Sequence, residues 1–168
     1  QILPAPPPPA PPLLVVPHHA AAQAAHGNAS HHAAPAQSGP PHSGAATKFG
    51  PGPDFLPKAV QFALIQGDPS QSGIYTVRLK FPANFHFPPH FHPADEHVTV
   101  LSGTIALGMG ETWHDAKPET RGPGGYASMP AESRHYFMTK TAATIQVHGM
   151  GPFAVNYVNP ADDPSKKK

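Results

Sequence analysis

The segment His90-Phe91-His92-Pro93-Ala94-Asp95-Glu96 constrains the fold and the chemistry of this chain more than any other stretch. Two histidines separated by one residue point to the same face of an extended strand, because strand side chains alternate. Glu96 follows His92 by four residues, so the same parity predicts that its carboxylate shares that face. Two imidazoles and one carboxylate at one point can hold a first-row transition metal and leave coordination positions open. We therefore predict a metal site here, completed by an imidazole from a distant strand.

The spacing resembles the first sequence motif of the cupins, His-x-His-x3-Glu-x6-Gly. His90, His92, Glu96 and Gly103 match it without a gap. The resemblance extends over roughly residues 55–160, about two thirds of the chain, and the short distance between the motifs is typical of small single-domain bacterial cupins. It implies an all-β, cupin-type double-stranded β-helix, which is a jelly-roll barrel of two sheets.

The second cupin motif, Gly-x5-Pro-x-Gly-x2-His-x3-Asn, has counterparts in Gly124, Pro130 and His135. The chain departs from it at Glu132, where glycine is usual, and at Thr139, where asparagine is usual. The resemblance implies that His135 is the third imidazole. With it, the metal ligands are predicted to be His90, His92, Glu96 and His135. Glu96 is interpreted as a ligand, the alternative being a carboxylate that orients one of the histidines. Three nitrogens and one oxygen suit Fe, Mn, Ni, Cu or Zn, and the sequence does not choose among these divalent ions.

The alternation of short apolar runs with turn residues independently indicates an all-β barrel or sandwich. No segment has a sustained helical period. Strands are expected at residues 59–65, 74–81, 96–101, 104–108, 126–129, 134–138, 143–148 and 153–158, with a loop marked by Pro88-Pro89. Val98, Val100, Ile105, Met129 and Phe137 are expected to line a dry pocket around the metal.

Three regions differ in composition. Residues 1–50 are rich in Pro, Ala and His and contain no charged Asp, Glu, Lys or Arg before Lys48, which predicts an extended arm without a core of its own. Residues 55–160 form the predicted barrel, and residues 161–168 a polar, basic tail. The arm is either a linker or a segment that packs on a neighbouring barrel, anchored by Leu13-Leu14-Val15-Val16. In the second case it would build a homo-oligomer, and a filament if the arrangement is head-to-tail.

Composition excludes several classes of function. The net charge of +1 gives no electrostatic basis for binding nucleic acid, and no apolar run approaches the ~20 residues of a membrane span. The absence of cysteine removes disulfides and thiolate ligands. The chain starts at Gln1 without an intact signal peptide, and a removed signal would leave such a start, so we expect an exported protein, periplasmic or extracellular.

Other side chains are weaker candidates for a role at the site. His86 is expected to line its mouth and His97 to face away from it, while Glu132 and Tyr126 are candidates for a general base. No catalytic residue can be assigned from the sequence. By resemblance, the protein is interpreted as a metal-dependent cupin that acts on a small oxygen-containing substrate, as a dioxygenase or isomerase. The alternatives are a metal-binding module without turnover and a structural subunit of an extracellular assembly.

Overall fold

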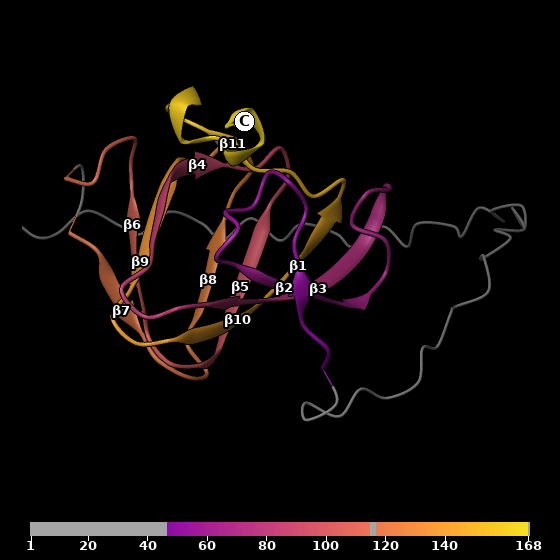
Figure 1. The fold of residues 1–168 in the computed structure, drawn as a ribbon, viewed down its shortest axis with the longest axis horizontal. Coiled ribbons are helices and arrows are strands. Elements are labelled where there is room, and N and C mark those ends of the chain that lie inside the picture. The colour runs from indigo at the N-terminus through magenta and orange to yellow at the C-terminus, as the bar shows by residue number, and fades with distance from the viewer. Residues whose placement is uncertain (1–46, 115–116, 168) are drawn as a thin grey trace, which may run out of the picture. The chain divides into compact units, whose positions relative to one another are not determined.

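The structure, a computed structural model, describes residues 47–114 and 117–167. This part of the chain is almost entirely β-strand, as the alternating sequence predicts (Figure 1). The strands are β1 (Gly50–Pro51), β2 (Gln61–Gln66), β3 (Gly73–Phe81), β4 (His86–Phe91), β5 (Glu96–Ser102), β6 (Ile105–Met109), β7 (Glu119–Arg121), β8 (Tyr126–Met129), β9 (His135–Thr139), β10 (Ala143–Gly151) and β11 (Asn156–Tyr157). Two short 3-10 helices follow, η2 (Pro160–Asp162) and η3 (Pro164–Lys166). Most of the predicted arm, residues 1–46 with the Leu13–Val16 anchor, lies outside the described residues.

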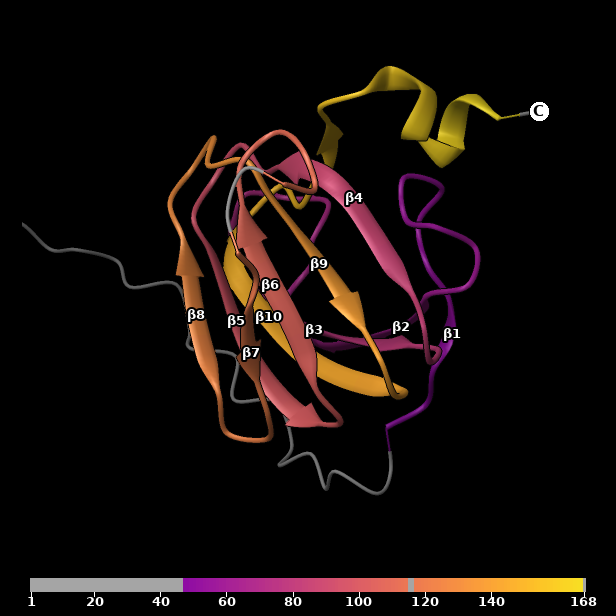
Figure 2. The same cartoon turned by 90° about the vertical axis from the view of Figure 1, so that its left-hand side faces the viewer.

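The strands form two antiparallel sheets that face each other (Figure 2). One sheet has six strands in the order β1-β2-β3-β10-β5-β8, and the other has five in the order β11-β4-β9-β6-β7. Strands that follow each other in sequence therefore often belong to opposite sheets, as in a jelly roll. The predicted all-β, two-sheet fold class is confirmed.

Apolar side chains from both sheets meet in one core. The burial pattern of β3 alternates along the strand, so that Tyr75, Val77, Leu79 and Phe81 point inward. Phe81 packs edge-on against Phe137 of the opposite sheet, with ring centroids 4.9 Å apart. Alternation of apolar and polar residues is the signal that predicted this strand, and inter-sheet burial is its physical reason.

Strand β4 differs from the prediction, because Pro88 and Pro89 lie within the strand and not in a loop. The pairing of β4 with β9 shifts between Phe87, which is opposite Phe137, and His90, which is opposite His135. Three steps along β4 thus match two along β9, which is a β-bulge. Because of the extra residue, Phe87 and His90 are both buried although they are an odd number of positions apart. The prolines, which cannot donate to the ladder, occupy the irregular positions.

Other differences concern short elements at the sheet edges. β7 was not predicted from its sequence Glu119-Thr120-Arg121, which has no apolar residue. The strand expected at 153–158 contains only the two residues of β11, because Phe153 and Val155 turn into the core. None of the helical turns in the described ranges is long or apolar enough to span a membrane.

Candidate metal centre

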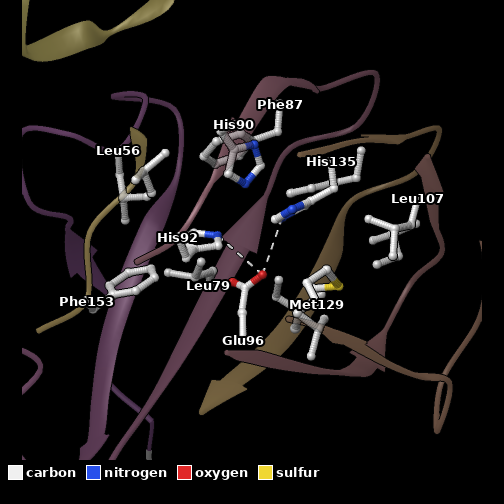
Figure 3. A pocket seen from close by; sticks show the side chains of 15 residues that line it. Leu56, Leu79, Phe87, His90, His92, Glu96, Leu107, Met129, His135 and Phe153 are labelled. Atoms are coloured by element: carbon white, nitrogen blue, oxygen red, sulfur yellow. Dashed lines mark ion pairs between the residues drawn. The ribbon is translucent and has the colours of Figure 1, made fainter. Parts of the chain in front are cut away.

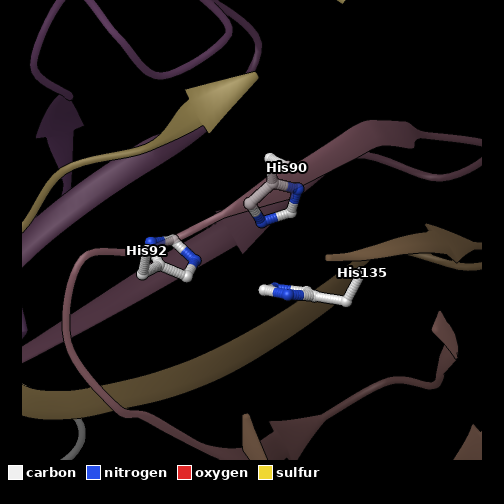
Figure 4. A group of neighbouring side chains, drawn as sticks. All are labelled: His90, His92 and His135. Carbon is white, nitrogen blue, oxygen red and sulfur yellow. The ribbon is translucent and has the colours of Figure 1, made fainter. Parts of the chain in front are cut away.

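His90, His92 and His135 come together between the two sheets, and their imidazole rings face one another (Figure 4). One nitrogen of each ring lies within 4.8 Å of the corresponding atoms of the others. His90 and His135 are direct partners on the neighbouring strands β4 and β9, and His92 follows β4 by one residue. All three are buried, with exposed fractions of 3%, 6% and 2%. The structure thus gathers the three histidines that the two motifs single out.

Each imidazole is fixed by a hydrogen bond to a backbone carbonyl. His90 Nδ1 lies 2.7 Å from Pro88 O, His92 Nδ1 2.6 Å from Ala154 O, and His135 Nδ1 2.9 Å from Ser133 O. Because a carbonyl can only accept, each Nδ1 carries the proton and the neutral ring has its lone pair on Nε2. An outer hydrogen bond of this kind orients a histidine for metal binding.

Glu96 lies on β5 of the opposite sheet and places its carboxylate against two of these lone pairs (Figure 3). Its Oε2 is 3.3 Å from His92 Nε2 and 3.4 Å from His135 Nε2. Parity along one strand was the wrong reason for placing it here, because the chain turns between His92 and Glu96 and crosses to the other sheet. The predicted position is correct nevertheless, because the crossing brings the start of β5 back to the same point.

The His92 Nε2 lone pair and the Glu96 carboxylate, which face each other, need a cation between them. His92 Nε2 is buried and makes no hydrogen bond within the described part of the chain, although a carboxylate oxygen is 3.3 Å away. A lone pair that faces an ionised carboxylate in a buried site is repelled unless a proton or a metal ion lies between them. The residues present therefore fit a divalent metal ion, and in its absence a proton on His92 is the alternative.

The pKa values follow from burial and from this charge arrangement. Burial, together with the neighbouring His135 and His92, holds the pKa of His90 well below its ordinary value. For His92 the effect of burial is outweighed by the Glu96 carboxylate, which raises its pKa. Burial alone would raise the pKa of Glu96, but the two imidazoles beside it lower it strongly, so the carboxylate is ionised.

The cavity around these four side chains is small and otherwise apolar. It measures about 20 Å³, room for about one water molecule. Its polar lining residues are the three histidines and Glu96, and the others are Leu56, Leu79, Phe87, Val98, Ile105, Leu107, Met129, Phe137, Ile145, Phe153 and Val155. Four of the five apolar residues predicted around the metal are in this lining, whereas Val100 is buried in the core without belonging to it.

Hydrogen bonds between two turns fix the positions of the candidate ligands relative to one another. Glu132 N donates to His92 O at 2.8 Å, and Ala131 N donates to Asp95 Oδ1 at 2.8 Å. The turn before His135 is therefore bonded directly to the turn between His92 and Glu96. This cross-connection fixes the spacing of the candidate ligands His92 and His135, which lie 43 residues apart in the sequence.

Glu132 adopts a left-handed backbone conformation, with φ of 64°, which explains why glycine is usual at this position of the motif. A non-glycine residue there costs about 1–2 kcal/mol, part of which is offset by the conformational entropy that glycine loses on folding. We expect Glu132→Gly to raise the free energy of unfolding by about 0.5–1 kcal/mol, measured by urea denaturation. Asn84→Gly, at a φ of 56°, is the control, and its gain should be smaller because asparagine tolerates this region. A loss of stability in Glu132→Gly would contradict the prediction.

Several predicted side chains lie outside the cavity. Tyr126 is 53% exposed on the outer face and bonds His97 Nδ1 at 2.6 Å, and Glu132 is exposed in its turn, so neither is placed to act as a general base. His86 does not line the mouth of the cavity either. The bulge in β4 turns it outward, where its ring lies 5.3 Å from Trp113. His97 faces away from the site, as predicted, and stacks on His148 at 5.0 Å.

Comparison with known proteins gives matches in structure but not in sequence families. No protein-family model and no curated protein matches the sequence. The polyketide cyclase RemF from Streptomyces resistomycificus aligns over 76% of this chain and 90% of its own, with a TM-score of 0.62 and 20% identity. The cupin domain of Schizosaccharomyces pombe Cnp3 aligns over 66% and 73%, with a TM-score of 0.51 and 14% identity. An RmlC-like cupin from Shewanella frigidimarina aligns over 65% and 87%, with a TM-score of 0.50 and 12% identity.

The chain has the cupin fold. The identities are too low to carry over any activity, so the comparison establishes the barrel alone. It agrees with the sequence motifs, whose histidines and glutamate meet inside this cupin barrel.

Proposed function

We propose that this cupin binds one divalent transition metal through His90, His92, Glu96 and His135, and that it is a metal-dependent enzyme acting on a small oxygen-containing substrate. The observation that carries the proposal is the convergence of three buried imidazoles, each oriented through its Nδ1 proton, on one ionised carboxylate. Four ligands on a six-coordinate ion leave two positions for other groups.

The residues of the barrel would have separate roles in such an enzyme. A bound metal ion would supply a Lewis acid that polarises an oxygen of the substrate. The carbonyls of Pro88, Ala154 and Ser133 hold the imidazoles in one orientation, and the apolar lining excludes bulk water. Exclusion of water strengthens the electrostatic interaction between the site and a charge that develops on the substrate.

The structural neighbours include an enzyme but do not decide whether this chain has turnover. RemF, a polyketide cyclase, has a barrel of this shape, whereas the Cnp3 domain is described only as a cupin domain. Turnover must therefore be argued from the site, where a complete and buried ligand set favours chemistry. The alternative, an assembly subunit joined by its proline-rich arm, depends on residues outside the described part and stays a prediction.

Metal content tests the ligand assignment. Elemental analysis of the purified protein should find about one equivalent of a transition metal, and the double variant His90→Ala/His92→Ala should lose it, because two remaining ligands bind weakly. His97→Ala/His148→Ala is the matched control, since it removes two histidines from the outer face and should keep the metal. The six histidines before residue 46 are replaced by alanine in every protein compared, so that they do not contribute. Equal metal in both double variants would refute the assignment.

A further inference from the structure

The metal cavity has a larger neighbour on one side of the barrel. A groove of about 480 Å³ lies between β7 and β8, which are the terminal strands of the two sheets and do not pair with each other. In Figure 2 these strands run next to each other where the sheets part. A groove of this volume is in the range of small-molecule sites. The metal cavity alone, at about 20 Å³, holds no organic molecule.

Two side chains belong to both spaces. Leu107 and Met129 line the metal cavity on one side and the groove on the other. Met129 is directly opposite Glu96 in the pairing of β8 with β5, and both residues are labelled beside the site in Figure 3. Leu107 and Met129 therefore form at least part of the wall between the cavity and the groove. Methionine has three rotatable bonds and repacks easily, so this wall can open without moving a strand.

A second groove, of about 520 Å³, borders the cavity at Leu56. That wall is braced by the backbone. Leu56 N donates to Pro53 O at 2.8 Å, and Tyr157 O–H donates to Phe55 O at 2.8 Å. These bonds hold the backbone beside Leu56 in place, and Pro53 and Pro57 stiffen it further. The wall at Met129 is the easier of the two to open.

We propose that the groove between β7 and β8 binds the substrate of the metal site, and that Leu107 and Met129 determine which part of it reaches the metal. This inference rests on the proposed function. The groove has apolar side chains in Leu107, Met109 and Met129, and a polar rim in Ser128 and in the Glu119–Arg121 ion pair of 2.9 Å. The substrate class that fits is an amphipathic organic molecule. Its oxygen-bearing end passes between Leu107 and Met129 to the metal, and its apolar part lies in the groove against Leu107, Met109 and Met129.

The route is tested without metal or turnover, by the rate at which diethyl pyrocarbonate modifies His135 in the metal-free protein. Peptide mass spectrometry follows His135, with the partly exposed His148 as an internal reference. Met129→Ala should accelerate modification of His135 about tenfold, because truncating a buried side chain removes much of the wall. Two further truncations are the controls. Leu56→Ala opens the wall toward the second groove, and Leu79→Ala truncates a residue that lines the metal cavity but borders neither groove.

The three truncations separate the route from a general loss of stability. Acceleration in Met129→Ala alone supports the proposal. Equal acceleration in all three means that global unfolding exposes His135, and acceleration in Leu56→Ala alone places the entrance at the other groove. Either result overturns the proposal. Because none of these rates depends on bound metal, a failure here is distinct from a failure of the metal assignment.

The substrate class is tested with two metal-chelating probes on the zinc-loaded protein. Octanohydroxamate should bind about tenfold tighter than acetohydroxamate in calorimetry, since two extra buried methylenes suffice for that factor. Met109→Asp, which puts a charge in the groove away from the metal ligands, should abolish this difference. Equal affinity for both probes in the unsubstituted protein would overturn the amphipathic class.

Discussion

Removal of the metal is expected to lower the melting temperature of the barrel by about 10 °C or more. Ligand binding stabilises the folded state in proportion to its affinity, and a metal at 1,000 times its dissociation constant contributes about 4 kcal/mol. A domain of this size changes its melting temperature by a few degrees for each kcal/mol. Calorimetry before and after treatment with a chelator, with metal content verified, measures the effect. His90→Ala/His92→Ala should melt at one temperature in both conditions, and an unchanged melting temperature of the unsubstituted protein would refute the prediction.

Acid should have the same effect as the chelator. Each imidazole binds a metal through a deprotonated Nε2, so protons compete with the metal for the same atom. The stabilisation by metal is therefore present at neutral pH and is lost as falling pH lets protons displace the metal from these atoms. Because this loss belongs to the metal complex, the difference in melting temperature between loaded and metal-free protein should shrink as the pH is lowered.

Alanine substitution at three glycines is expected to destabilise the fold in a graded order. A Cβ at Gly103, which has φ of 72°, would lie 2.2 Å from Ala142 O and 2.7 Å from Ala143 Cα. Gly124 has φ of 80° with nothing within 4 Å, and Gly122 has open space without a positive φ. Gly122→Ala should be neutral, Gly124→Ala should cost about 1–2 kcal/mol for the left-handed backbone, and Gly103→Ala should cost more than both together.

Urea denaturation of the three variants tests this order. Since Gly103 lies in the turn where the chain passes from β5 to β6 of the other sheet, and its clash is with backbone atoms, the neighbouring chain cannot relieve it by a change of rotamer. If Gly103→Ala were as stable as Gly124→Ala, the close approach of this turn to the start of β10 would be wrong. Each of the two cupin motifs contains one of the glycines with a positive φ, Gly103 and Gly124.

The sequence predicted that His90, His92, Glu96 and His135 converge better than it predicted the strands that carry them, and their binding of a metal stays a prediction. His90, His92 and His135 could be named because the spacing of both motifs is local information. The placement of Glu96 was right for the wrong reason, since parity assumes one continuous strand and the chain instead crosses between sheets. The bulge at Pro88-Pro89 was missed because prolines ordinarily mark a loop, and the sequence does not show the partner strand that keeps them in register.

The groove could not have been predicted from the residues that form it. Glu119, Arg121 and Tyr126 lie on two edge strands of opposite sheets, and their neighbourhood depends on where the sheets part. β7 itself has no apolar residue and carries no strand signal. Periodicity identifies a residue that faces a core, whereas a space between two edges is a property of the assembled barrel.

The proline pair in β4 changes which residues of the strand face the core. Phe87 belongs to the aromatic core and His90 to the ligand set, and the bulge is what lets one strand serve both. Deleting a single proline would restore regular alternation, so that Phe87 and His90 would share a face by ordinary parity. Two steps along β4 would then match two along β9, so His90 would stay opposite His135 while the bend and extra twist of the bulge would be lost. Relatives of this chain can therefore have one residue fewer between Phe87 and His90 and still bring the histidine opposite His135.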